Sequence, residues 1–190
     1  MVLNPLITVL IPCHSTQYLQ DALESIAIQT LQKDLFEVLV IVDRVDPDSV
    51  KEILSDFEFQ SRVLNSPEPG IVAALNFGLN NTSSELIARM DEDDVMTARR
   101  LEMQKKFLDS NPDYAAVGGQ LELINDATKT IGFSNYPLSL QTKSFKAIKQ
   151  SPLPHPGTMF RRGLVLELGG YRDFLPEDWD LWVRINEHWK

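Results

Sequence analysis

The first half of the chain alternates between short apolar runs and segments whose apolar residues recur at helical spacing. Leu6 to Ile11 and Phe36 to Val42 are continuous aliphatic and β-branched runs, the pattern of strands buried on both faces. Between them, Leu19 to Ala27 carries one apolar stripe, which predicts a helix packed on a sheet. Strands buried on both faces need helices on each side of their sheet. The alternation therefore predicts an α/β fold with an open, mixed but mostly parallel sheet and helices on both faces.

The alternation continues to about residue 110 and becomes mixed from Tyr114 onward. We expect further helices from Asp48 or Ser49, over Ile71 to Leu79, over Leu101 to Leu108, over Leu140 to Lys149, over Leu164 to Leu168 and over Asp178 to Trp189. We expect further strands over Arg62 to Leu64, Glu85 to Met90, Ala115 to Ile124, Thr130 to Phe133 and Thr158 to Arg161. No linker separates the halves, so we expect one domain: a nucleotide-binding half, about residues 1–110, and a second half, about 111–190, that shapes another pocket.

Composition excludes several classes of protein. The longest apolar runs fall far short of the roughly 20 residues that cross a bilayer, and the first five residues carry no cationic signal-peptide start. Cys13 is the single cysteine, which fits a reducing, cytoplasmic setting. The formal net charge of −9 disfavours sequence-independent binding to nucleic acid. We therefore expect a soluble cytoplasmic protein in which any phosphate ligand needs a metal or a local basic pocket.

The most informative stretch is the acidic cluster Asp91-Glu92-Asp93-Asp94, directly after the predicted strand that ends at Met90. Two carboxylates about 5 Å apart repel by ~3 kcal/mol at an effective dielectric near 20. A hard divalent cation such as Mg²⁺ or Mn²⁺ removes that conflict. In an extended segment Asp91 and Asp93 face the same way and could bind one ion. The alternative is a solvated turn that caps a helix near Thr97, and spacing alone does not separate the two.

Further motifs flank the acidic cluster in a fixed order. They are Ile11-Pro12, Ile41-Val42-Asp43, Gly70-x-x-x-Ala74-x-Asn76, Ala88-Arg89-Met90-Asp91-Glu92-Asp93-Asp94, Arg100-Leu101-Glu102-x-Gln104, Gly118-Gly119, His155-Pro156, Gly169-Gly170-Tyr171 and Glu177-Asp178-Trp179-Asp180-Leu181-Trp182. From about residue 6 to about residue 185, this series resembles the family 2 glycosyltransferases, which have the GT-A fold.

The resemblance implies transfer of a sugar, with inversion, from a nucleotide-diphosphate sugar, usually a UDP-sugar, to a hydroxyl of a glycan or lipid-linked acceptor. It implies Mn²⁺ or Mg²⁺ as cofactor. Matched by position, the donor-binding residues are Pro12, Asp43, Asn76, Asp91 and Asp93. Pro12 and Asp43 would hold the nucleobase, Asp91 would lie near the ribose and the metal, and Asp93 would be the main metal ligand. Asp178 matches the catalytic base, a role that a carboxylate within reach of the acceptor hydroxyl can perform.

The resemblance also implies a cellular setting, most commonly the assembly of bacterial surface polysaccharide or lipid-linked glycan. Family members usually continue past the last motif with segments that bind the acceptor or associate with a membrane, whereas this sequence stops at Lys190. We therefore expect a chain shortened at its C-terminus that works in the cytoplasm. Association with the inner face of the membrane would then run through segments outside this chain.

Two other functions stay open from the residues alone. The run from Asp91 to Val95 also fits the Asp-x-Asp-x-Val loop of haloacid dehalogenase-like phosphatases, although that family places the loop after its first strand. A non-catalytic nucleotide-sugar-binding module would keep the fold with a degenerate site, but Asp91, Asp93 and Asp178 are all present. Neither a Gly-x-Gly-x-x-Gly nor a P-loop lysine motif occurs, which disfavours dinucleotide redox chemistry and P-loop hydrolysis.

Two motifs of the second half also have simpler interpretations. Glu177, Asp178 and Asp180 could do no more than cap the last helix. His155 stands between two prolines without a His or Cys partner at ligand spacing, so we expect it to shape a loop facing the acceptor pocket.

Overall fold

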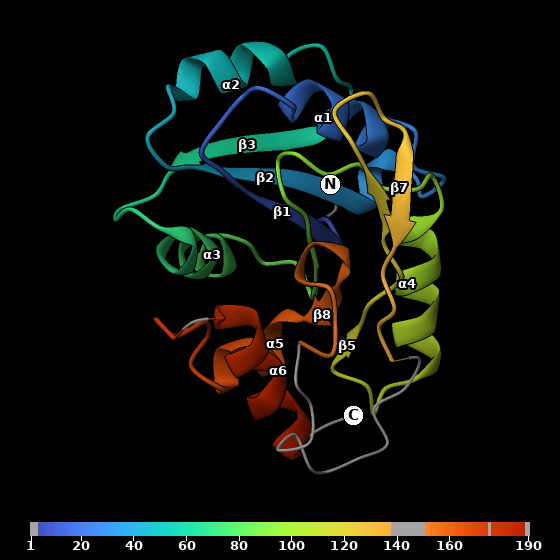
Figure 1. Cartoon of the computed structure of the whole chain (residues 1–190). Coiled ribbons are helices and arrows are strands. Elements are labelled where there is room, and N and C mark those ends of the chain that lie inside the picture. The colour runs from blue at the N-terminus through green and yellow to red at the C-terminus, as the bar shows by residue number, and fades with distance from the viewer. Residues whose placement is uncertain (1–3, 138–150, 175, 189–190) are drawn as a thin grey trace.

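A computed structural model of the chain describes residues 4–137, 151–174 and 176–188, and its largest element is a six-stranded sheet of order β3-β2-β1-β4-β8-β5 (Figure 1). The strands of this sheet are β1 (Ile7–Cys13), β2 (Phe36–Val42), β3 (Gln60–Asn65), β4 (Leu86–Arg89), β5 (Ala116–Val117) and β8 (Met159–Arg161). β1 to β4 pair in parallel, whereas β8 runs antiparallel to both β4 and β5. The sheet is mixed and mostly parallel, which confirms the predicted fold class.

Helices cover both faces of the sheet (Figure 1). The α-helices are α1 (Leu19–Ala27), α2 (Pro47–Leu54), α3 (Ile71–Asn80), α4 (Arg100–Ser110), α5 (Arg162–Glu167) and α6 (Glu177–His188), and the short 3₁₀ helices are η1 (Lys33–Leu35) and η3 (His155–Gly157). One hydrophobic core joins the sheet to α1, α2 and α4, and the other joins it to α3, α5 and α6. None of the helices in the described ranges is both long and apolar enough to cross a membrane.

β1 shows why its sequence is apolar throughout. Val9 and Ile11 point into the first core, whereas Leu10 points into the second, and all three are fully buried. α3 packs tightly on this strand at Gly78, where a Cβ would lie 2.3 Å from Cδ1 of Leu10. Because only glycine avoids that overlap, Gly78 sets the spacing between α3 and the sheet.

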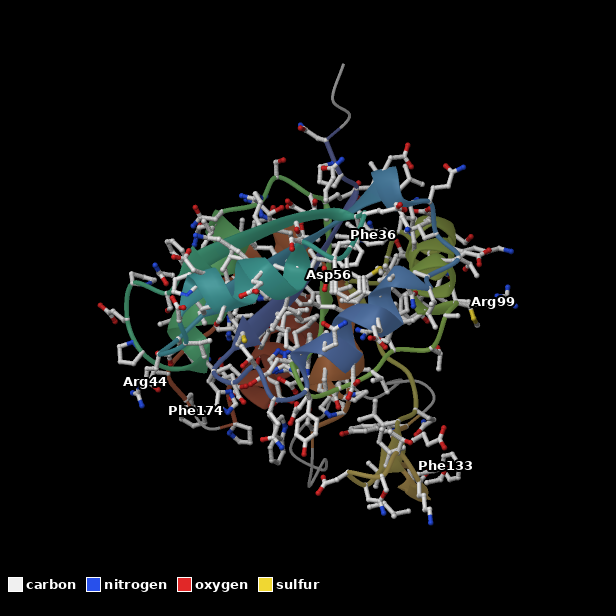
Figure 2. The ribbon with its side chains drawn as sticks, turned by 90° about the horizontal axis from the view of Figure 1, so that it is seen from above. Phe36, Arg44, Asp56, Arg99, Phe133 and Phe174 are labelled. Atoms are coloured by element: carbon white, nitrogen blue, oxygen red, sulfur yellow. The ribbon has the colours of Figure 1, made fainter. Side chains whose placement is uncertain are left out.

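A second, two-stranded sheet is formed by β6 (Glu122–Ile124) and β7 (Thr130–Phe133). The single strand predicted over Ala115 to Ile124 is therefore wrong, because the chain leaves the main sheet after Val117, where its pairing with the short strand β8 ends. In Figure 2, Phe133 of this hairpin lies at the rim of the molecule, whereas Phe36 of β2 lies among the interior side chains. The helix predicted over Leu140 to Lys149 lies outside the described residues.

Candidate functional site

Three parallel strands end at one edge of the main sheet. The N–H of Asp43, just past β2, donates to the carbonyl oxygen of Cys13 in β1 (2.8 Å), and the N–H of Met90, just past β4, donates to that of Leu10 (3.2 Å). β1 lies between β2 and β4, so this edge contains the point where the strand order reverses. Open α/β sheets bind ligands at such a point. The fold therefore brings Pro12, Asp43 and the acidic cluster to one edge.

Asp43 is fixed by the start of α3. Its Oδ2 accepts a hydrogen bond from the N–H of Gly70 (2.8 Å), and Nε of Arg44 lies 3.6 Å from its Oδ1. Arg44 has a left-handed backbone, with φ of 62°, and its side chain points outward at the rim (Figure 2). The hydrogen bond from Gly70 holds the Asp43 side chain in place. That side chain is 19% exposed, so it still reaches the surface. Pro12, in contrast, is buried within β1.

The acidic cluster forms a turn. The N–H of Asp94 lies 3.4 Å from the carbonyl oxygen of Asp91, so the segment is not extended, and the turn of the alternative interpretation is confirmed. The chain turns back because both flanking methionines are buried, and the N–H of Met96 donates to Oγ of Ser25 on α1 (3.0 Å). The helix cap of that alternative is wrong, since α4 begins only at Arg100 and has no side-chain cap.

Glu92 differs from the other three acids of the turn. Its side chain is 6% exposed, and its Oε1 accepts from the backbone N–H of His14 (3.3 Å) and lies 2.5 Å from Nδ1 of the same residue. Burial, together with the charge of Glu92, raises the pKa of the Cys13 thiol to about 11. Glu92 therefore ties the acidic turn to the end of β1, through its contacts with His14.

Buried Arg89 and half-buried Arg100 lie next to the turn and only partly balance its charge. Nη1 of Arg89 lies 2.5 Å from Oδ2 of Asp91, although Nε and Nη1 of this buried guanidinium have no hydrogen-bond acceptor of good geometry among the described residues. Nη2 of Arg100 donates to the backbone oxygen of Arg89 (2.7 Å). Burial, and then the charges of Asp91 and Asp93, still raise the pKa of Asp94 to about 6. The turn places four carboxylates beside two guanidinium groups, so it carries more negative charge than these arginines neutralise.

This donor set fits a hard divalent cation. Asp91, Asp93 and Asp94 offer only carboxylate oxygens, the ligands that Mg²⁺ and Mn²⁺ prefer. In the described part of the chain, no three His, Cys, Asp or Glu side chains gather closely enough to hold an ion by themselves. Mg²⁺ commonly takes one or two protein carboxylates and completes its shell with phosphate and water. The turn therefore fits a cation that is shared with a phosphate-bearing ligand.

Asn76 lies on α3, and both polar atoms of its side-chain amide contact the backbone of Tyr171. Nδ2 donates to the backbone oxygen of Tyr171 and Oδ1 accepts from the N–H of Tyr171, both at 2.8 Å. Gly170 precedes this contact with φ of 73°, and a Cβ there would lie 2.4 Å from Oδ1 of Asn76. Asn76 therefore joins α3 to the segment that leads into α6.

Asp178 lies in the first turn of α6, where Oγ of Ser151 donates to its Oδ2 (2.7 Å). Glu177, one residue earlier, has a different partner. Its Oε1 lies 3.4 Å from Nδ1 of His155, which lowers the pKa of Glu177, and Nε2 of His155 lies 2.9 Å from the hydroxyl of Tyr171. The structure thus gives each of these adjacent acids its own partner from outside α6, a hydroxyl for Asp178 and an imidazole for Glu177.

Asp180 holds the segment before α6 in place. It pairs with Arg172, and its Oδ2 accepts from Nε of Arg184 (2.8 Å), which lowers the pKa of Asp180. Nη2 of Arg184 also donates to the backbone oxygen of Gly170 (2.8 Å). Capping is therefore an incomplete description of the acids at the start of α6, because each has side-chain partners elsewhere.

Sequence reasoning missed several residues of this edge: Arg89, the pairing of Glu92 with His14, Ser151, and the contact between His155 and Tyr171. Only Arg89 had a signal, because an arginine inside a strand that is otherwise fully buried requires a local charge partner. The other contacts join residues far apart in the sequence.

Comparison with known proteins identifies the chain's relatives. The profile of glycosyl transferase family 2 matches residues 8–169. The chain is 32% identical to the O-antigen biosynthesis glycosyltransferase WbnJ of Escherichia coli, over 95% of this chain and 71% of that protein. It is 30% identical to an uncharacterized glycosyltransferase of Haemophilus influenzae, over 89% of this chain, and spans 64% of that protein's length.

The fold has a match among solved structures. The mannosyltransferase PcManGT from Pyrobaculum calidifontis, in complex with GDP-Man and Mn²⁺, superimposes with a TM-score of 0.70 at 20% identity, over 94% of this chain and 51% of that one. This likeness shows the GT-A fold. The profile match overturns the phosphatase alternative, whose loop would also have to follow the first strand rather than β4. The chain belongs to glycosyl transferase family 2.

Proposed function

We propose that the protein transfers a sugar from a nucleotide-diphosphate sugar, in the first instance a UDP-sugar, to an acceptor hydroxyl with inversion at the anomeric carbon. The observation that carries this proposal is the under-neutralised acidic turn of Asp91 to Asp94 at the reversal point of the sheet, in a chain of this family. A diphosphate could not approach these carboxylates without a cation, because the charges repel. We therefore propose that the donor and its metal ion bind at the edge of the sheet where this acidic turn lies.

The donor half follows from the positions of the acids. Asp43, held by Gly70 and still partly exposed, would accept hydrogen bonds from the nucleobase beside the β1 segment at Pro12. Asp93 and Asp91 would hold Mn²⁺ or Mg²⁺, which supplies Lewis-acid stabilisation of the leaving diphosphate. Asn76 binds the backbone of Tyr171 with Nδ2 and Oδ1, and we propose that it shapes the donor site from α3 and offers its second amide hydrogen to the donor.

The acceptor half centres on Asp178. In a single displacement the acceptor oxygen attacks the anomeric carbon, the bond to the diphosphate breaks on the opposite side, and the acceptor proton goes to a base. Oγ of Ser151 donates to Oδ2 of Asp178, and we propose that Oδ1 takes that proton. General-base catalysis of this kind contributes typically ~10²- to 10⁴-fold.

The biological setting is proposed from a relative. WbnJ is named for O-antigen biosynthesis, and we propose that this protein likewise extends a surface polysaccharide or lipid-linked glycan. Its acceptor would then be a glycan hydroxyl presented at the inner face of the membrane.

A binding experiment tests the donor site. Melting temperatures are measured with UDP and with GDP, each with Mn²⁺, with Mg²⁺ and with chelator. A ligand at 100 times its dissociation constant stabilises by ~2.7 kcal/mol. We expect stabilisation by UDP only when metal is present. An equal shift in chelator would contradict the metal bridge, and a shift with GDP but not UDP would change the proposed nucleotide.

A further inference from the structure

A chain of three polar side chains runs through the interior beneath the start of α6. The hydroxyl of Tyr171 lies 2.9 Å from Nε2 of His155, and Nδ1 of His155 lies 3.4 Å from Oε1 of Glu177. Tyr171 is 2% exposed, and the side chains of His155 and Glu177 are 7% and 13% exposed. Buried polar groups are costly unless each has a partner, so the arrangement constrains where the protons lie.

The protons of Tyr171, His155 and Glu177 have one consistent arrangement. Burial, and then the positive charge of Arg89, lower the pKa of His155, while the carboxylates of Glu177 and Asp178 oppose that shift. A neutral imidazole carries one N–H. If that N–H were on Nε2, the lone pair of Nδ1 would face a carboxylate oxygen and repel it. Nδ1 therefore carries the proton and directs it at Glu177, and Nε2 accepts from the phenol of Tyr171.

Tyr171 and His155 are each held in place by further contacts. Asn76 on α3 binds the backbone of Tyr171 through Nδ2 and Oδ1 of its side-chain amide. His155 begins η3, and its ring packs against Trp182 of α6 with centroids 6.1 Å apart. Oγ1 of Thr158 donates to the carbonyl oxygen of Pro154, which fixes the turn from the other side (2.6 Å). The imidazole consequently has little freedom to rotate away from Glu177.

We propose that His155 is a positioning residue for sugar transfer: it holds Glu177 through Nδ1 and so leaves Asp178 as the acid that faces the acceptor. This inference rests on the proposed role of Asp178 as base. The two carboxylates are adjacent, both lie in the first turn of α6, and either could take a proton. Among the described residues, Nδ1 of His155 lies 3.4 Å from Oε1 of Glu177, whereas the hydroxyl of Ser151 donates to Oδ2 of Asp178 (2.7 Å). His155 neither touches the reacting atoms nor takes up the acceptor proton.

Two substitutions of His155 separate positioning from simple filling of space. Asparagine places its amide nitrogen near the position of Nδ1, whereas glutamine places it near Nε2. H155N should keep a donor for Glu177 and retain kcat within about 3-fold. H155Q should lose that donor and lower kcat by about 10- to 100-fold, the range found for residues that orient metal ligands, with the donor KM unchanged. Y171F leaves the Nδ1 proton in place and should behave like H155N.

The measurements are the melting temperature of each variant, UDP release from a panel of UDP-sugars with Mn²⁺, and the imidazole ¹H–¹⁵N correlation spectrum of the wild-type protein. We expect an Nδ1–H tautomer that does not titrate between about pH 6 and about pH 8. Equal kcat for H155N and H155Q, or an Nε2–H tautomer, would overturn the positioning role. The wild-type spectrum decides the question even where a variant does not fold. If D178N also has the kcat of the wild type, the result contradicts the proposed role of Asp178 as base, and not only the positioning role of His155.

Discussion

Oγ of Ser151 donates a 2.7 Å hydrogen bond to Oδ2 of Asp178, from a residue that precedes η3 to one that opens α6. The same hydroxyl lies 2.9 Å from the carbonyl oxygen of Leu153. Since a serine has one hydroxyl hydrogen, an ionised Asp178 and Leu153 compete for it. Ser151 therefore orients the proposed base through a bond that a single substitution can remove.

Replacing Ser151 by alanine should lower the transfer rate without unfolding the protein. A hydrogen bond to a charged group is worth about 1.5–3 kcal/mol, which bounds the loss in kcat at about 10- to 100-fold. Ser151→Thr keeps a hydroxyl and is the matched control. The kcat and donor KM of both variants are measured, and a threonine variant as slow as the alanine variant would show that the hydroxyl is not what matters.

Asp94 makes stability depend on pH. Its pKa in the folded protein is raised to about 6, above the ordinary value of 3.8, so the folded state binds more protons than the unfolded state between these values. Stability from this group is full below about pH 4 and is lost as the pH rises through about 6. Asp94→Asn should therefore melt above the wild type at neutral pH in chelator. If the variant melted below the wild type at neutral pH, ionised Asp94 would not be destabilised by its burial and by the charges of Asp91 and Asp93.

The sequence predicted those parts of the fold that depend on local pattern. The bounds of α1 and β2 match the predicted ranges. α2 begins at Pro47, slightly earlier than expected, because Oδ1 of Asp46 accepts from the N–H of Asp48 and moves the cap upstream (3.2 Å). Asp46, Asp48 and Ser49 can all cap a helix, so the sequence alone does not show which of them does so.

The candidate site could be predicted only as a set of acids. Asp91 and Asp93 alternate as an extended strand would, but the burial of Met90 and Met96 closes the segment into a turn. That burial depends on α1 and the sheet packing on both methionines, which no local spacing encodes. Glu92 is chemically like its neighbours, and only its distance to His14 makes it structural.

Asp93 should be needed for metal-dependent nucleotide binding and not for folding. Asp93→Asn should abolish the thermal shift produced by UDP with Mn²⁺, while the melting temperature without ligand stays equal or rises because one repelling charge is removed. The control is Asp56→Asn, at an exposed aspartate that follows α2. Retention of the full UDP shift by Asp93→Asn would remove this residue from the metal site.

Gly170 and Gly169 form a matched pair for testing the contact between Asn76 and Tyr171. Both glycines have positive φ, so alanine costs about 1–2 kcal/mol of strain at either. At Gly170 the added Cβ would lie 2.4 Å from Oδ1 of Asn76, whereas at Gly169 no atom of the described residues lies within 4 Å of it. Gly170→Ala should lower the melting temperature by about 4 °C more than Gly169→Ala. If calorimetry gave equal decreases in melting temperature for the two variants, the Asn76 side chain would move aside at little energetic cost.

The most direct test of the proposed function is the transfer rate of Asp178→Asn, measured beside its metal-dependent affinity for UDP by calorimetry. If Asp178 is the base and the acidic turn binds the donor, the variant should bind UDP with Mn²⁺ within about 2-fold of the wild type and lose at least ~10²-fold in kcat. Asparagine keeps an acceptor for Ser151 and also caps helices well, so the fold should persist. Near wild-type turnover would contradict the account and make Glu177 the next candidate, and an equal loss of UDP binding would show that the donor and base sites are not separate.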